Sequence, residues 1–150
     1  MIDFLDYNDG RTTLVSKNSV IEGNLETLSS LEILGRIEGD VDVTGLLSVY
    51  GKLNGNVEST DMIARTGSVI NSKKINALYD IFVAQKSNVT GNIQCNSIEV
   101  YGNISGDVLA RDTVIVRAGG VIFGDVNCKT LIVDNGGIVN GKISLSYDLF

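Results

Sequence analysis

The sequence predicts an all-β fold: a single-stranded parallel β-helix, or solenoid, with three short strands in each turn. Two observations lead to this prediction. A short Gly-centred segment recurs at nearly constant spacing, and apolar residues alternate within each repeat. Between Gly23 and Gly141 there are 118 residues and seven intervals, which gives a mean period of about 17 residues. A period this short, with turns built on Gly, is typical of a solenoid.

The recurring segment consists of an apolar residue, any residue, Gly, then Asn or Asp, and a second apolar residue. A sharp bend between strands needs a backbone conformation that Gly adopts without strain, so we place a corner at each copy. Asn tolerates the left-handed region better than most residues, which accounts for one copy with Asn in the Gly position. The predicted corners are Gly23, Gly39, Gly55, Asn71, Gly91, Gly106, Gly124 and Gly141.

Between corners the apolar residues are spaced by two, which is the period of a strand with one face inward. One such turn reads Ile93, Cys95, Ile98, Val100 and Ile104. A single turn cannot bury this face, whereas turns stacked about 4.8 Å apart form one parallel-sheet core. The longest interval, from Asn71 to Gly91, predicts a bulge or loop around residues 72–74. A β-sandwich is the alternative, but it does not need Gly in phase along the chain.

Both cysteines belong to a column of mostly small residues four positions past each corner. Cys95 and Cys128 lie two turns apart with Ala110 between them, so at roughly 10 Å they are too distant for a disulfide. The chain has neither a CxxC motif nor any His to complete a metal or redox site. We therefore expect reduced thiols in the core.

The composition argues against several classes of function. A net charge of −6 disfavours nucleic acid and anionic membranes as electrostatic partners. The absence of His removes the base that hexapeptide-repeat acyltransferases use, and tight turns leave little room for a substrate cleft. Residues 136–142 match most of a P-loop, but Ile143 replaces the Ser or Thr that would hold Mg²⁺. We expect no enzymatic activity, no catalytic residues, no cofactor and no metal site.

The sequence also predicts a location in the cytoplasm. No stretch of about 18 apolar residues is present, so no transmembrane helix is expected. The first ten residues lack the basic region and the long apolar core of a signal peptide.

The in-phase copies of the Gly-centred segment resemble those of the bactofilin family, over roughly residues 13–146. This resemblance implies a right-handed, three-sided β-helix that polymerises end to end into nonpolar filaments without nucleotide or metal. It also implies a bacterial cytoskeletal scaffold for cell-wall, cell-shape or polarity factors, often peripheral at the inner face of the membrane. We accordingly expect a flexible N-terminal tail at 1–12, a β-helix domain at 13–146 and a short C-terminal tail at 147–150.

The N-terminal tail allows three interpretations. Some members of the family carry an N-terminal membrane-binding peptide, and by this resemblance Ile2, Phe4 and Leu5 are candidate membrane contacts. Acidic residues replace the basic ones of such peptides, so a solvated acidic tail is the second interpretation. In the third, residues 1–12 fold across the first turn as a cap, with Phe4 and Leu5 packed inward.

The end turns of a β-helix expose unpaired backbone groups above a cross-section of apolar side chains. Natural solenoids usually cover their ends with a polar cap, and we find no amphipathic helix at either end. We therefore expect each end to join another copy of the chain. The candidate polymerisation residues are Leu14, Val15, Val20, Leu25, Leu28 and Leu31 at one end, and Val139, Ile143, Leu145 and Phe150 at the other.

Two functions follow from this fold. The first is a filament-forming structural scaffold whose main partner is a second copy of itself. The alternative is a non-polymerising β-helical binding module that displays its outward side chains to a protein partner. Concentration-dependent filaments would favour the scaffold, and a sharp monomer peak would favour the module.

Overall fold

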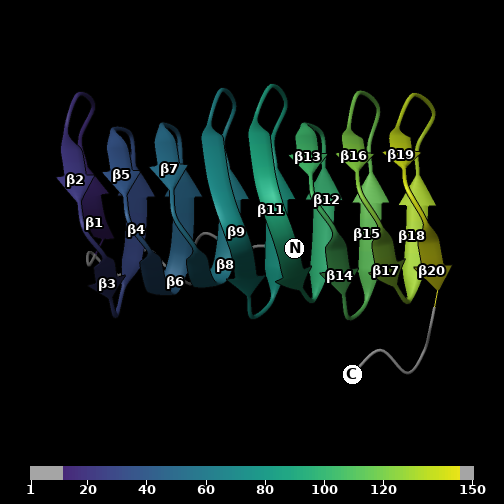
Figure 1. The fold of residues 1–150 in the computed structure, drawn as a ribbon, viewed down its shortest axis with the longest axis horizontal. Coiled ribbons are helices and arrows are strands. Elements are labelled where there is room, and N and C mark those ends of the chain that lie inside the picture. The colour runs from purple at the N-terminus through teal and green to yellow at the C-terminus, as the bar shows by residue number, and fades with distance from the viewer. Residues whose placement is uncertain (1–11, 146–150) are drawn as a thin grey trace.

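The computed structural model describes residues 12–145, and every regular element in this range is a β-strand. Figure 1 shows a rod in which the chain advances from β1 at one end to β20 at the other. The strands are β1 (Thr12–Val15), β2 (Val20–Glu22), β3 (Leu25–Thr27), β4 (Ser30–Ile33), β5 (Arg36–Glu38), β6 (Val41–Val49), β7 (Lys52–Asn54), β8 (Val57–Ala64), β9 (Val69–Ala77), β10 (Asp80–Val83), β11 (Asn88–Cys95), β12 (Ser97–Val100), β13 (Asn103–Ser105), β14 (Val108–Ala110), β15 (Thr113–Val116), β16 (Val121–Phe123), β17 (Val126–Cys128), β18 (Thr130–Val133), β19 (Ile138–Asn140) and β20 (Ile143–Leu145).

The coil makes about 8 turns of about 17 residues, with parallel pairing between successive turns, which confirms the predicted fold. Three stacks of strands form its faces. The first face contains β1, β4, the end of β6, the end of β8, β10, β12, β15 and β18. The second contains β2, β5, β7, the starts of β9 and β11, β13, β16 and β19. The third contains β3, the starts of β6 and β8, the ends of β9 and β11, β14, β17 and β20.

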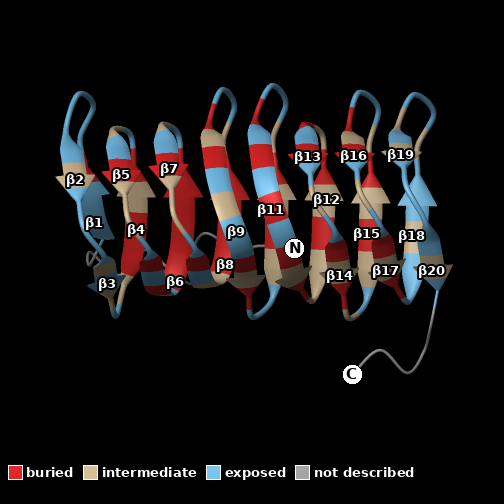
Figure 2. Cartoon of the chain, viewed as in Figure 1, coloured by how far each residue is buried: buried red, intermediate tan, exposed pale blue. Residues whose placement is uncertain are grey.

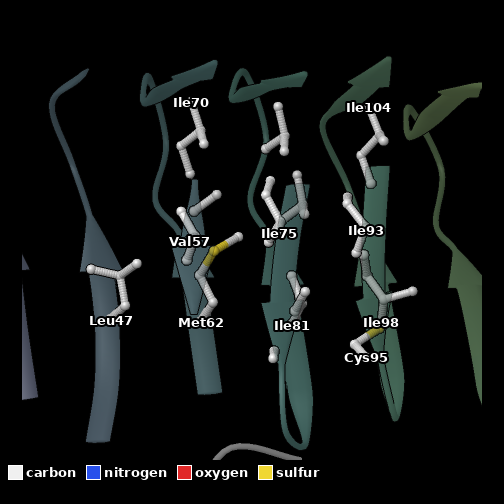
Figure 3. Close-up of a cluster of buried hydrophobic side chains, with 14 of the residues drawn as sticks. Leu47, Val57, Met62, Ile70, Ile75, Ile81, Ile93, Cys95, Ile98 and Ile104 are labelled. Carbon is white, nitrogen blue, oxygen red and sulfur yellow. The ribbon is translucent and has the colours of Figure 1, made fainter. Parts of the chain in front are cut away.

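Inward side chains from all three faces form one continuous core along the rod. Figure 3 shows this interior, in which Ile81 and Ile98 from the first face lie near Ile75 and Ile93 from the third. Each of these isoleucines is at most 2% exposed. Burying one such side chain stabilises the fold by about 1.5–3 kcal/mol, so the stacked columns carry most of the stability. The small-residue column is also confirmed, with Cys95 and Ala110 paired in register and both fully buried.

The bulge predicted around residues 72–74 is present in β9. The pairing of β9 with β11 shifts between Thr90 and Asn92, where residues 72 and 73 lie opposite a single residue of β11. The predicted corner at Asn71 is one residue out of register. Asn71 pairs with Asn54, and its side-chain amide donates to the Asn54 side-chain oxygen. Ser72 is the residue that stacks on Gly55, to whose carbonyl oxygen its hydroxyl donates.

The corner glycines are required by close stacking as well as by backbone conformation. Gly124 has φ of 148°, a region that side chains rarely adopt. A Cβ added at Gly124 would also overlap the carbonyl oxygen of Gly106, the corner glycine of the preceding turn. Any larger residue at this position must therefore push two turns apart.

The Asn or Asp that follows each corner glycine connects successive turns. The Asp40 carboxylate accepts the backbone N–H of Asn56 at 2.9 Å, and the Asp107 carboxylate accepts that of Asp125 at 2.8 Å. Asn24 and Asp125 make the same contact to the next turn. These residues therefore act as acceptors for backbone N–H groups at the corners, which would otherwise lack a partner.

Candidate functional site

The first and last turns of the described chain consist of edge strands. At one end, β1, β2 and β3 pair only with β4, β5 and β6 of the second turn. At the other end, β18, β19 and β20 pair only with β15, β16 and β17. One side of each of these six strands therefore lacks a partner strand among residues 12–145. Such edges present backbone N–H and C=O groups on which another chain can continue the ladder.

The C-terminal end exposes an apolar cross-section. Its inward positions are filled by Leu131 and Val133 of β18, Val139 of β19, and Ile143 and Leu145 of β20. In the middle of the rod the same columns are fully buried, whereas Val133, Ile143 and Leu145 are 44%, 45% and 60% exposed. Figure 2 shows this change as a shift from buried to exposed colours toward β18–β20. The register thus places five aliphatic side chains on one open end.

The N-terminal end has a smaller and more polar cross-section. Two of its inward positions are threonines, Thr13 of β1 and Thr27 of β3. Val15 is 4% exposed, while Ile21 and Leu25 are half-buried against the core. This end therefore offers less apolar surface to a partner.

The structure divides the predicted polymerisation residues that it describes into three groups. Leu25, Val139, Ile143 and Leu145 occupy inward positions in the end turns, where a stacked copy would contact them. Leu14, Val20 and Leu28 are exposed, but Leu14 and Val20 lie on the outer sides of their strands and Leu28 lies at a corner.

Two of the predicted residues are already covered, and others lie outside the described range. Val15 and Leu31 are buried, and Leu31 belongs to the second turn, where it pairs with Thr13. Phe150 and the candidate membrane contacts Ile2, Phe4 and Leu5 lie outside the residues that the structure describes.

Sequence reasoning missed Leu131 and Val133 as end residues. Both follow the same two-residue spacing as Val114 and Val116, with which they pair in register. Extending the two-residue spacing through the whole last turn, instead of using only its copy of the Gly-centred segment, would have identified them. The signal was therefore present in the sequence.

Charged side chains connect turns on the outside of the rod near the C-terminal end. The Arg117 guanidinium contacts the Glu99 carboxylate at 2.7 Å and the Asp134 carboxylate at 3.0 Å, which bridges three successive turns. These hydrogen bonds raise the pKa of Arg117 above its usual range. On the second face, hydrogen bonds from Asn54 and Arg36 lower the pKa of Glu38. Such solvent-accessible contacts add little to stability.

Among the described residues, no group of three or more His, Cys, Asp or Glu side chains is arranged to hold a metal ion. Cys95 and Cys128 are buried, unpaired thiols. Burial raises the pKa of Cys95 to about 12 and also raises that of Cys128, so neither is a reactive thiolate. Over residues 12–145 the structure has no helix with the length and hydrophobicity of a membrane span.

The chain was also compared with known proteins. The family model for bactofilins, described as polymer-forming cytoskeletal proteins, matches residues 52–144. No curated protein and no solved structure matched the chain. The family match covers the continuous stack from β7 into β20, so the residues that identify the family are those that build the coil and its C-terminal end. The chain belongs to the bactofilin family of polymer-forming cytoskeletal proteins.

Proposed function

We propose that this chain is a structural subunit that polymerises by stacking the end turns of its β-helix, without nucleotide, into nonpolar filaments. The observation that carries the proposal is the C-terminal end, where edge strands surround five aliphatic inward side chains. A second copy placed on this end would continue the three ladders and bury the apolar cross-section. The family supports self-association, and the geometry supports the ends as its surface.

The driving force for this assembly is supplied by the chain itself. Apolar area removed from water contributes about 25 cal/mol per Å², and continued ladders satisfy the edge groups. Apolar burial and backbone hydrogen bonding both arise from the contact itself, so no step needs nucleotide hydrolysis. In a nonpolar filament like ends meet, so C-terminal ends would join C-terminal ends and N-terminal ends would join each other. The proposal therefore includes two different contacts.

The cellular role that we propose is a cytoplasmic scaffold, peripheral at the inner face of the membrane, for cell-wall, cell-shape or polarity factors. Support for this part comes from the cytoskeletal character of the family. The outward side chains of the third face, such as Asp42 and Glu58, would be repeated along a filament and offer a polar surface to such partners.

Negative-stain electron microscopy of the purified protein, without nucleotide or added metal, tests this function. The wild type is expected to form filaments that lengthen with protein concentration. Leu145→Lys places a charge in the open apolar end and should abolish the filaments, because a buried unpaired charge is costly. The matched control is Ser144→Lys, which changes the outward neighbour in β20 and should leave filaments intact.

Two outcomes would contradict the proposal. Unaltered filaments in Leu145→Lys would remove the C-terminal end from the interface. Monodisperse short rods in the wild type would favour the non-polymerising binding module, and the search would then move to partners along the faces of the rod.

A further inference from the structure

The chain contains three asparagines that precede a glycine, Asn54, Asn135 and Asn140. An Asn-Gly pair is a favoured site of spontaneous deamidation, because glycine has no Cβ to hinder attack on the asparagine side chain and leaves the backbone free to turn. In this reaction the backbone nitrogen of the glycine attacks the side-chain carbonyl carbon of the asparagine. A hydrogen bond that holds the glycine N–H, or a partner that holds the asparagine amide, therefore slows the reaction.

The interior pair is held by neighbouring turns. The Gly55 N–H donates to the Asn71 carbonyl oxygen at 2.9 Å. The Asn54 amide nitrogen donates to the two Glu38 carboxylate oxygens at 2.9 and 3.0 Å, and the Asn54 side-chain oxygen accepts the Asn71 amide N–H at 3.0 Å. Both reacting groups of this pair are therefore engaged.

The pair in the last turn lacks these contacts. Gly141 stacks on Gly124, the corner glycine of the preceding turn, whose N–H donates to the Asn140 carbonyl oxygen at 3.0 Å. Among residues 12–145 no further turn follows, and the Gly141 N–H donates to no backbone acceptor in this range. The Asn140 side chain is exposed, and its ladder neighbour is Phe123, whose ring cannot hold the amide as a carboxylate does. Within the described chain, neither reacting group of this pair is held in place.

The third pair lies in a turn at the surface. Asn135 and Gly136 are the central residues of the corner between β18 and β19, and both are exposed. The Gly137 N–H closes this corner by donating to the Asp134 carbonyl oxygen at 2.9 Å. Figure 1 shows that the corner extends outward from the two strands that it joins. Asn135 therefore gives a reference rate for an accessible Asn-Gly pair in the same molecule.

We propose that Asn140 is a deamidation site that is open at a free C-terminal end and closed by assembly. The Gly141 nitrogen forms a bond to the side-chain carbonyl carbon of Asn140. The bond from that carbon to the amide nitrogen breaks, and ammonia leaves with the proton of the Gly141 N–H. Water then opens the succinimide ring at either of its carbonyl carbons, which gives aspartate or isoaspartate. Water is the only co-reactant in this sequence.

Closure of the site by assembly rests on the proposed stacking of C-terminal ends. Ring formation requires the backbone at Asn140 to rotate, and an end turn that is paired on one side opens more readily than an interior turn. A second copy that continues the ladders would engage edge donors such as the Gly141 N–H and hold the last turn from both sides. Asn140 would then be held much as Asn54 is.

The reaction disables the end on which it occurs. Both products add a negative charge to the last turn, and isoaspartate also inserts a methylene group into the main chain. The corner has no space for this insertion, since even a Cβ at Gly141 would overlap the Gly124 carbonyl oxygen. Because β20 follows the corner, its register with β17 would be lost, and Ile143 and Leu145 would leave the apolar cross-section. Subunits that stay unassembled therefore lose the ability to join.

Peptide mass spectrometry of the full-length chain, incubated in mildly alkaline buffer, tests the site. Below the concentration for assembly, Asn140 should convert at least about tenfold faster than Asn54, since an interior turn is open only a small fraction of the time. Asn135 reports the rate of an accessible pair in the same sample. Equal conversion of Asn140 and Asn54 under these conditions would overturn the proposed site.

The same measurement in filaments tests closure by assembly. Conversion of Asn140 should slow at least about tenfold in filaments, while Asn54 stays slow. Unchanged conversion of Asn140 in filaments would overturn closure and leave filament formation itself intact. If the protein formed no filaments, the proposed function would fail, and the ratio of Asn140 to Asn54 in the unassembled chain would still decide whether the site exists.

The effect of the reaction on assembly is tested with Asn140→Gln, which keeps the amide but must close a larger and less favourable ring. After the same incubation, the wild type should lose polymerisation in proportion to its converted Asn140. The Asn140→Gln variant should polymerise as it did when fresh. The matched control is Asn135→Gln, which should lose polymerisation as the wild type does. Equal losses in the wild type and in Asn140→Gln would show that the damage arises elsewhere and would overturn the disabling effect.

Discussion

The two ends of the rod differ in what their outermost turns expose. The inward positions of the last turn are all aliphatic, and Ile143 and Leu145 are 45% and 60% exposed. The first turn has Thr13 and Thr27 at two of the equivalent positions, and its Val15 is 4% exposed. Both ends have unpaired edge strands, so the two threonines are a difference in side chains. Val15 and Val133 have identical side chains in the same column, and they differ in exposure, 4% against 44%.

This difference implies a hierarchy of contacts in a nonpolar filament. The strength of an apolar interface follows the area that it removes from water, so contacts between C-terminal ends should be the stronger kind. Contacts between N-terminal ends rely more on continued backbone ladders and should be weaker. We therefore expect dimers joined through C-terminal ends to form first and to be the units that elongate.

The largest expected effect comes from comparing two variants, each with one lysine in the same inward column. One variant carries the lysine at the N-terminal end and the other carries it at the C-terminal end. Leu25 and Ile143 both occupy the first inward position of the third face, in the first and last turns. Ile143→Lys should leave monomers, because only the weaker contact remains. Leu25→Lys should leave dimers joined through the intact C-terminal ends. Sedimentation velocity over a range of concentrations distinguishes the two species.

The controls for this pair are the outward neighbours Glu26→Lys and Ser144→Lys, which carry the same charge outside the column. Both should polymerise as the wild type does. The hierarchy would be refuted if Leu25→Lys gave monomers and Ile143→Lys gave dimers. Dimers from both variants would mean that the two ends bind with similar strength.

A second pair compares the middle of the rod with its end. Ile93 and Ile143 share one column, but Ile93 is 2% exposed and Ile143 is 45% exposed. Ile93→Ala should lower the free energy of unfolding by about 2–5 kcal/mol, since it leaves a cavity between two turns. Ile143→Ala should lower it by less than about 2 kcal/mol, because its site is open and can relax. Urea unfolding at a concentration below assembly measures both, and equal losses would contradict an open C-terminal end.

The sequence predicts these columns because each turn repeats the same local rule. Alternation by two identifies Ile93 and Ile143 as inward residues, and Gly in phase places the corners that join the strands. The long interval before Gly91 correctly located the bulge in β9. Features that recur once per turn can therefore be predicted from one sequence alone.

Features that depend on distant contacts were not readable in this way. The shift from Asn71 to Ser72 in the corner column depends on which residue of the bulge stacks on Gly55. The role of Asp107 as an acceptor depends on a backbone donor in the next turn, 18 residues away. The burial of Ile63, an outward residue of β8, is not specified by the periodicity either. Leu31 was assigned to the end because the sequence alone leaves the limit of the first turn open.

The smallest expected effect concerns the two cysteines, which probe how far the opening of the C-terminal end extends into the rod. Cys95 lies in the interior of the stack, and Cys128 lies in β17 directly beneath the last turn, where it pairs with Leu145. Both side chains are fully buried. Because end turns of a solenoid open more readily than interior ones, Cys128 should react with maleimide several-fold faster than Cys95 in the unassembled protein.

Assembly provides the decisive comparison for this pair. Stacking a second copy on the last turn should slow the labelling of Cys128, because the last turn, which covers Cys128, can then no longer open on its own. Labelling of Cys95, already limited by opening of the interior, should change little. Mass spectrometry of the labelled peptides, below and above the concentration for polymerisation, reports both rates in one sample. A slowing of Cys95 with Cys128 unchanged would place the contact away from the C-terminal end, and would remove the asymmetry on which the hierarchy rests.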